Sequence, residues 1–197
     1  GIFFDRFRDV PAIVAAAGPS LTDSIPFIRE NRDRAIIIAV DTSWRILRKA
    51  GITPHFCVSV DPQLINARYF EGMPGSSTVL VSDPTVHPSV FRLFGGKAAI
   101  AGIAFPMMKW LEEYGGSRGD LAHGGSVSTN AYDFAKRLGA SPVIMVGQDL
   151  AFTRGLAHAR GSYLDEQMFL RTGRFRTAEM INRGQLRALP PLYVKGI

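Results

Sequence analysis

Short runs of apolar, largely β-branched residues alternate along this chain with segments whose apolar residues recur at helical spacing. The clearest run, at residues 35–40, is continuously apolar, which is typical of a strand in a parallel sheet covered by helices on both faces. Turn-forming Gly, Pro, Asp and Ser residues follow most of these runs. We therefore predict six strands, at residues 12–17, 35–40, 56–60, 78–81, 98–103 and 143–146.

Helices are predicted between and after these strands. Thr22 or Asp23 is a candidate cap for a helix that ends near residue 31. Further helices are predicted at 44–50, 106–114 and 126–138, a loop at 115–123, and helical segments near 165–170 and 178–186. The alternation predicts an α/β fold, a Rossmann-like three-layer α/β/α sandwich with a mainly parallel sheet. It does not indicate the order of the strands.

No internal repeat, low-complexity tract or linker divides the chain, so we expect residues 1–197 to form a single domain. The first residues include no initiator Met, and the last ones, 193–197, resemble the start of another element. We therefore expect the chain to be part of a longer protein.

Composition narrows the classes of function. The formal net charge of +6 favours phosphate-bearing molecules or nucleic acid, but no zinc-finger, RNP or basic heptad motif supports nucleic acid. The single cysteine, Cys57, excludes an internal disulfide framework and lies in an apolar run, so we expect a buried, inert thiol. No apolar run approaches the roughly 18–20 residues that span a bilayer. The expected location is the cytoplasm.

Polar or acidic residues follow five of the predicted strands. These endings are Gly18-Pro19-Ser20, Asp41-Thr42-Ser43, Ser59 to Pro62 with Asp61, Ser82-Asp83-Pro84, and Gly147-Gln148-Asp149. Each one alone is as consistent with a turn or helix cap as with a site. Open parallel sheets bind ligands outside the carboxyl ends of their strands, so the set favours a ligand site at that edge.

Two of the segments have the chemistry of phosphate binding. Gly18-Pro19-Ser20 offers backbone N–H groups and a hydroxyl, although it is neither a Walker A loop nor a G-x-G-x-x-G motif. A second segment offers more, because it places two glycines and three hydroxyls at a predicted helix N-terminus, where anions are favoured. Its residues are Gly124, Gly125, Ser126, Val127, Ser128 and Thr129.

Three further side chains are candidates for recognition or catalysis. Gln148 and Asp149 suit hydrogen bonding to a sugar or base at the floor of a cleft. His158 lies in a predicted loop and is a candidate general base, since an unperturbed histidine titrates near pH 6.5. It is equally consistent with a surface histidine. No H-E-x-x-H motif, cysteine cluster or G-x-S-x-G elbow is present.

Five segments, taken together in order, resemble one protein family. They are 15–21 (AAAGPSL), 38–42 (IAVDT), 59–62 (SVDP), 124–129 (GGSVST) and 146–153 (VGQDLAFT). They resemble the Maf (motility-associated factor) family of flagellin glycosyltransferases. The central domain of that family is shared with an archaeal 6-hydroxymethylpterin pyrophosphokinase and is related to bacterial sialyltransferases. The resemblance extends to about Ser162.

The resemblance implies transfer of a nonulosonic acid of the sialic, pseudaminic or legionaminic type. The donor would be a CMP-activated sugar and the acceptor a Ser or Thr of flagellin, in flagellum assembly and motility. No tightly bound cofactor and no metal are implied. Phe152 stands where the family commonly has a tyrosine.

By position, the resemblance also implies roles for single residues. Gly18, Pro19 and Ser20 would meet the phosphate or ribose, Asp41 and Thr42 would border the donor, and the 124–129 segment would contact the nucleotide above Gln148 and Asp149. His158, or an aspartate such as Asp149, would serve as the base.

Two alternatives remain open from the sequence. The first is an ATP-dependent 6-hydroxymethylpterin pyrophosphokinase, with Mg²⁺ held by Asp41, Asp61 or Asp149. The second is a non-catalytic module that keeps the nucleotide-binding fold and docks flagellin or an assembly partner. Metal-independent CMP binding favours the transferase, and Mg²⁺-dependent ATP binding favours the kinase. Binding of neither nucleotide leaves the docking module or a fragment that lacks a flank needed to complete the site.

Overall fold

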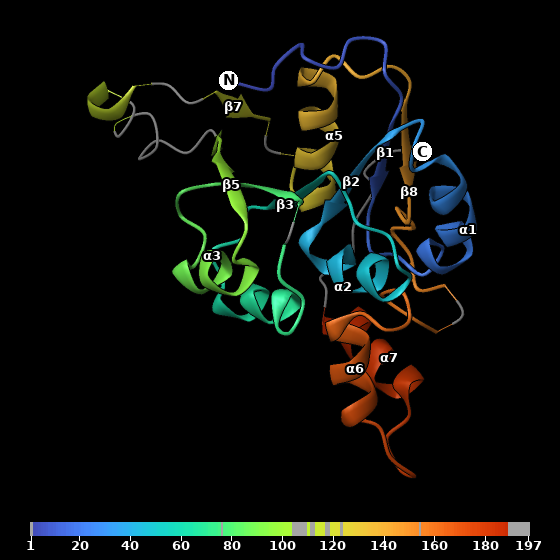
Figure 1. Ribbon diagram of the computed structural model, residues 1–197. Helices are drawn as coiled ribbons and strands as arrows, with labels where there is room; N and C mark the ends of the chain where they lie inside the picture. The colour runs from blue at the N-terminus through green and yellow to red at the C-terminus, as the bar shows by residue number, and fades with distance from the viewer. Residues whose placement is uncertain are drawn as a thin grey trace, which may run out of the picture.

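The computed structural model describes residues 2–75, 77–103, 110, 113–116, 119–122, 124–153 and 155–188. Most of the predicted helix at 106–114 and the whole 193–197 segment lie outside these residues. Figure 1 shows a central sheet with helices on both faces. The predicted three-layer α/β fold is confirmed.

Six parallel strands form the central sheet, in the order β5-β4-β3-β2-β1-β8. Their bounds are β1 Ala12–Ala15, β2 Ile36–Val40, β3 Phe56–Ser59, β4 Val79–Ser82, β5 Lys97–Ile100 and β8 Val143–Val146. β1 and β2 are buried along their whole length, because helices cover both of their faces. Their continuously apolar sequences make this burial on both faces favourable.

Helices cover the two faces unequally. One face carries α1 (Leu21–Asn31), α2 (Asp41–Lys49), the 3-10 helix η1 (Leu64–Phe70) and α3 (Pro88–Phe94), packed around Trp44 and Phe70. The other face carries α5 (Val127–Arg137), packed through Phe134. Connections between parallel strands are almost always right-handed. Strands added in one direction therefore place their helices on one face, and the return from β5 to β8 places α5 on the other.

The segment before β1 completes the α5 face. Its backbone N–H groups at Asp5 and Phe7 donate to the carbonyls of Arg137 and Leu138 at 2.8 Å each. Phe7 also packs edge-on against Phe56 of β3. The last carbonyls of a helix have no partner within the helix, so this segment serves as the C-terminal cap of α5.

Several details differ from the expectation. α2 begins at Asp41 rather than Trp44, and α1 begins at Leu21, so Ser20 rather than Thr22 or Asp23 precedes it. The predicted fifth strand is divided into β5 and β6 (Gly102–Ile103), and β6 pairs with β7 (Asp120–Leu121), inside the predicted loop. η1 and α3 have no counterpart in the prediction because each is only seven residues long, too short to show a helical period.

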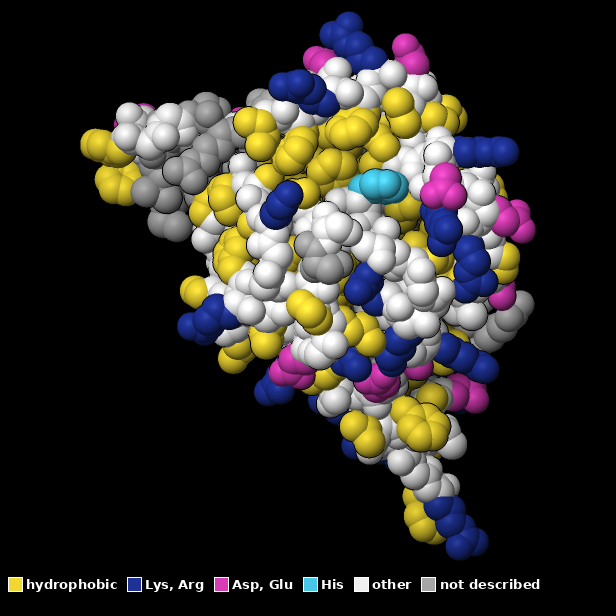
Figure 2. Space-filling model, in the orientation of Figure 1, with side chains coloured by type: hydrophobic (Ala, Val, Ile, Leu, Met, Phe, Trp, Pro, Cys, Tyr) yellow, Lys and Arg dark blue, Asp and Glu magenta, His cyan; other side chains and the backbone are white. Residues whose placement is uncertain are grey.

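The chain ends, within the described residues, in α6 (Tyr163–Leu170) and α7 (Ala178–Ala188). Tyr163 and Leu164 pack against the core beside α2. Beyond them, Phe169 and Phe175 are 77% and 87% exposed. Figure 2 shows hydrophobic side chains at the surface at the foot of the molecule, where Figure 1 places these helices. The α6–α7 segment therefore packs against the core mainly through the first turn of α6.

Among the described residues, none of the helices has the length and apolar character needed to cross a membrane. Cys57 is fully buried in β3, and burial raises the pKa of its thiol well above the usual value, as expected for an inert core cysteine.

Candidate functional site

A cavity lies at the carboxyl ends of β1, β2 and β8. β1 and β8 are neighbours in the sheet, yet the chain continues from β1 to β2 on one side and adds β8 on the other side of β1. Loops diverge at such a switch point and leave a crevice. Here it has a volume of about 560 Å³, within the range of small-molecule sites.

Five segments of the chain line this cavity. They are Ala16, Ala17 and Gly18 after β1; Val40 and Thr42 at the start of α2; Ser126, Val127 and Ser128 at the start of α5; 147–152 after β8; and Ala157 with His158. Seven of the predicted site residues are among them: Gly18, Thr42, Ser126, Ser128, Gln148, Asp149 and His158. The other seven do not line it: Pro19, Ser20, Asp41, Asp61, Gly124, Gly125 and Thr129.

The Gly18-Pro19-Ser20 turn is joined to the β8 loop by Asp149. One carboxylate oxygen of Asp149 accepts hydrogen bonds from the Ser20 hydroxyl at 2.8 Å and from the Ser20 N–H at 3.1 Å. The reason for glycine at position 18 is steric, because a Cβ there would lie 2.1 Å from Asp149 Oδ2 and 2.5 Å from the Gly147 carbonyl oxygen. Asp149 and Gly18 therefore first serve to hold two loops of the cavity wall together.

The N-terminus of α5 faces the cavity through two hydroxyl side chains. Ser126 is the N-cap, its Oγ accepting from the Ser128 N–H at 3.3 Å and lying 2.8 Å from Ser128 Oγ. Gly124 packs beside Thr129, whose Oγ1 would be 2.4 Å from a Cβ on that glycine, and Gly125 has a φ of +78°. The glycines thus shape the turn, and the two serines and the helix dipole present the anion-binding chemistry.

Asp41 lies beneath the cavity wall and is 2% exposed. Its oxygens accept hydrogen bonds from the Thr42 N–H at 2.7 Å and the Ser59 hydroxyl at 2.9 Å. Burial raises its pKa from 3.8 to about 6, and these hydrogen bonds oppose the shift only in part. Asp61, by contrast, forms a turn with Gln63, whose N–H donates to its Oδ1 at 2.9 Å.

His158 lies half-buried in the cavity wall. Burial lowers the pKa of its imidazole below 6.5, and the nearby carboxylate of Asp165 opposes the shift. This lowering of the pKa favours the neutral ring, which can accept a proton, at pH 7. Its position in the wall is compatible with the predicted role as a base.

Sequence reasoning missed the apolar part of the wall. Leu150, which is 88% exposed and has a φ of +51°, and the neighbouring Ala151 follow Asp149 along the rim. Apolar lining residues have no polar signature in a sequence. The run of small residues at 15–17 before Gly18 was the one available signal, since it leaves space at the end of β1.

No metal centre is indicated in the part of the chain that the structure describes, where no three His, Cys, Asp or Glu side chains are grouped to hold an ion.

The family model described as "6-hydroxymethylpterin diphosphokinase MptE-like" matches residues 1–155. The chain belongs to this MptE-like family. The match contains every cavity residue except Ala157 and His158. The candidate site therefore lies almost completely within the MptE-like domain.

Two individual matches extend this result. An uncharacterized protein of Treponema pallidum (strain Nichols) is 32% identical over 154 residues, which are 72% of this chain and 39% of the relative. The solved structure of a Maf glycosyltransferase from Magnetospirillum magneticum AMB-1 matches with a TM-score of 0.66 and 28% identity, over 73% of this chain and 23% of that chain. The resemblance of this MptE-like chain to the Maf family is thereby confirmed. The chain spans well under half the length of either protein.

Proposed function

We propose that this MptE-like domain is the donor-binding part of a glycosyltransferase. It would move a nonulosonic acid from a CMP-activated donor to a Ser or Thr of flagellin. The observation that carries the proposal is the cavity at the β1/β8 switch point, where a helix N-terminus and a neutral histidine line one space. The similarity to a Maf glycosyltransferase structure supports the choice of reaction.

The N-terminus of α5 is the best place for the phosphate of the donor. Its first-turn N–H groups and the hydroxyls of Ser126 and Ser128 offer hydrogen bonds to an anion. The charge on the phosphate grows as the bond from its oxygen to the sugar breaks. Hydrogen-bonding groups that already point at that phosphate lower the barrier, because they need no reorganisation during the reaction.

His158 is the better candidate for the base of the two predicted. Ser20 donates two hydrogen bonds to the carboxylate of Asp149, so that carboxylate is engaged in holding two loops of the wall together, whereas no hydrogen bond of this kind occupies His158 among the residues that the structure describes. In the proposed step the acceptor oxygen forms a bond to the anomeric carbon and its proton passes to His158. The bond between that carbon and the phosphate oxygen breaks, and CMP leaves with the electron pair.

Calorimetric titration of the domain with CMP and with ATP, each with and without Mg²⁺, tests the proposal. Ala151→Trp would fill the cavity from an exposed position on its rim, and Ala98→Trp, on the exposed edge strand β5, is the matched control. We expect metal-independent CMP binding that Ala151→Trp abolishes and Ala98→Trp leaves intact. CMP binding that survives Ala151→Trp would place the nucleotide elsewhere.

The family description favours one second candidate, an ATP-dependent 6-hydroxymethylpterin pyrophosphokinase. Of the three aspartates predicted to hold its Mg²⁺, only Asp149 lines the cavity, so we rank this function second. Mg²⁺-dependent ATP binding without CMP binding would promote it. Binding of neither nucleotide would favour a docking module.

A further inference from the structure

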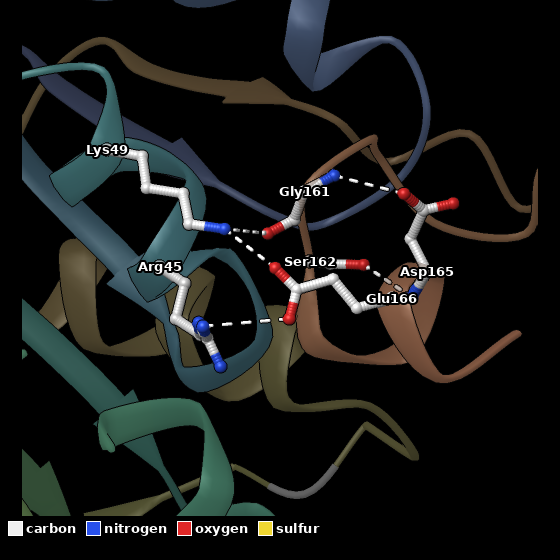
Figure 3. A network of polar contacts seen from close by, with 6 residues as sticks. All are labelled: Arg45, Lys49, Gly161, Ser162, Asp165 and Glu166. Carbon is white, nitrogen blue, oxygen red and sulfur yellow. Dashed lines mark hydrogen bonds and ion pairs between the residues drawn. The ribbon is translucent and has the colours of Figure 1, made fainter. Parts of the chain in front are cut away.

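Two cations on α2 hold the first turn of α6 (Figure 3). Lys49 Nζ donates to Glu166 Oε1 at 2.7 Å, and an Arg45 nitrogen lies 3.6 Å from Glu166 Oε2. The same helix begins at Asp41 and places Thr42 in the cavity wall. α2 is therefore connected at one end to the cavity and at its outer turns to α6.

The turn before α6 is held by further contacts to the same cluster. Lys49 also reaches the carbonyl oxygen of Gly161 at 3.4 Å, and the Gly161 N–H donates to Asp165 Oδ2 at 3.1 Å (Figure 3). Ser162 is the N-cap of α6, with its Oγ accepting from the Asp165 N–H at 3.0 Å. Residues 161–166 thus form one hydrogen-bonded unit attached to Lys49.

The other end of this short segment is anchored to the sheet. The N–H of Ala159, which is fully buried, donates to the carbonyl of Ala17 at 2.8 Å, directly after β1. His158 immediately precedes Ala159 and lines the cavity. The segment that carries His158 is therefore fixed at residue 159 by the sheet and at residues 161–166 by α2.

Glu166 has a larger role than an ordinary surface acid. The Arg45 side chain is only 18% exposed, and its Nε is buried without a hydrogen-bond partner among the described residues. The loss of Glu166 would leave this guanidinium without its carboxylate in a place that water reaches poorly, which is unfavourable. The segment would then move so that the cation could become hydrated.

We infer that Glu166 is a positioning residue: through Lys49 and Arg45 it holds residues 158–162 against α2 and so keeps His158 in the wall of the cavity. The catalytic consequence rests on the proposed function, in which His158 acts as the base. The positional consequence does not, because it concerns only the place of the imidazole.

Four variants test this inference. Glu166→Gln removes the carboxylate charge, and Lys49→Met removes its closest partner. Lys49→Arg keeps the cation. Glu179→Gln is the matched control. Like Glu166 in α6, Glu179 lies in the first turn of its helix, α7, but it is exposed. The readouts are CMP affinity by calorimetry and the NMR titration of His158, assigned with His158→Gln.

We expect Glu166→Gln and Lys49→Met to weaken CMP binding about threefold to tenfold, because the displaced segment carries both Ala157 and His158 of the cavity wall, whereas a change of the His158 side chain alone leaves the backbone of that wall in place. The pKa of His158 should rise toward 6.5, because the ring becomes more hydrated while Asp165, the charge that acts on it, is unchanged. Lys49→Arg and Glu179→Gln should leave both readouts as in the wild type.

An unchanged His158 titration in folded Glu166→Gln would overturn the inference, as would equal effects from Glu179→Gln. If the wild-type domain binds no CMP, the proposed donor site fails. The His158 titration then still decides the positioning role on its own.

Discussion

The carboxylate of Asp149 accepts two hydrogen bonds from Ser20, one from its hydroxyl and one from its backbone N–H, across 129 positions of sequence. This contact joins the loop after β1 to the loop after β8, the two neighbouring strands at the switch point. It defines the shape of the cavity between them and leads to the first of four predictions.

Asp149→Ala should destabilise the fold by about 1–3 kcal/mol, because the Ser20 donors lose their acceptor in a half-buried position. Asp149→Asn should lose less, since its amide oxygen can still accept. Urea unfolding followed by circular dichroism measures both free energies. Equal stability of Asp149→Ala and wild type would show that the contact is not needed for folding.

Gly18→Ala should be destabilising by about 1–3 kcal/mol, since the new methyl group would overlap Asp149 and the Gly147 carbonyl. Gly173→Ala is the control, because a Cβ there meets no atom within 4 Å. The same urea experiment compares the two. A neutral Gly18→Ala would mean that the loops separate at little cost.

Asp41 should make stability depend on pH. Its pKa is raised on folding from 3.8 to about 6, so its contribution is fully present below pH 3.8 and is lost as the pH rises through 6. The loss amounts to about 3 kcal/mol. As the pH rises from 4 to 6, the wild type should therefore lose stability that Asp41→Asn keeps. The exposed control Asp120→Asn should follow the wild type. Parallel curves of unfolding free energy against pH for wild type and Asp41→Asn would contradict this.

His158→Gln should lower turnover by about 100-fold or more in a transferase assay, with little change in CMP affinity. The lowered pKa of His158 means that the neutral, proton-accepting ring persists below pH 6.5. The wild-type rate should therefore fall at a lower pH than it would with an unshifted histidine, which is half protonated at pH 6.5. A rate that falls from pH 7.5 downward would point to a different base.

Much of the fold was predictable because it is encoded locally. The apolar runs at β1 and β2 and the glycines and prolines that follow them identify buried parallel strands from consecutive residues alone. Short elements were not predictable in this way: η1 and α3 form where Phe70 and Phe94 reach Trp44 in the core.

The candidate site was predictable in outline only. Strand endings rich in Ser, Asp and Gly indicated the correct edge of the sheet, and seven of the predicted residues line one cavity there. Asp61 lies in a turn before η1, and Asp41 faces inward toward Ser59. Asp61 follows β3, which contributes no residue to the cavity, whereas Asp41 follows β2, whose neighbouring Val40 and Thr42 do line it.

The sequence by itself determined the α/β class, the buried strands and the kind of chemistry available at their ends, since these depend on neighbouring residues and their periodicity. Only the tertiary structure decided the strand order, the place of the cavity, the contact between Asp149 and Ser20, and the attachment of Glu166 to α2. The reason is physical: these features arise from contacts between residues that are distant in the sequence, 129 positions apart for Asp149 with Ser20 and 117 for Glu166 with Lys49, and no local pattern records them.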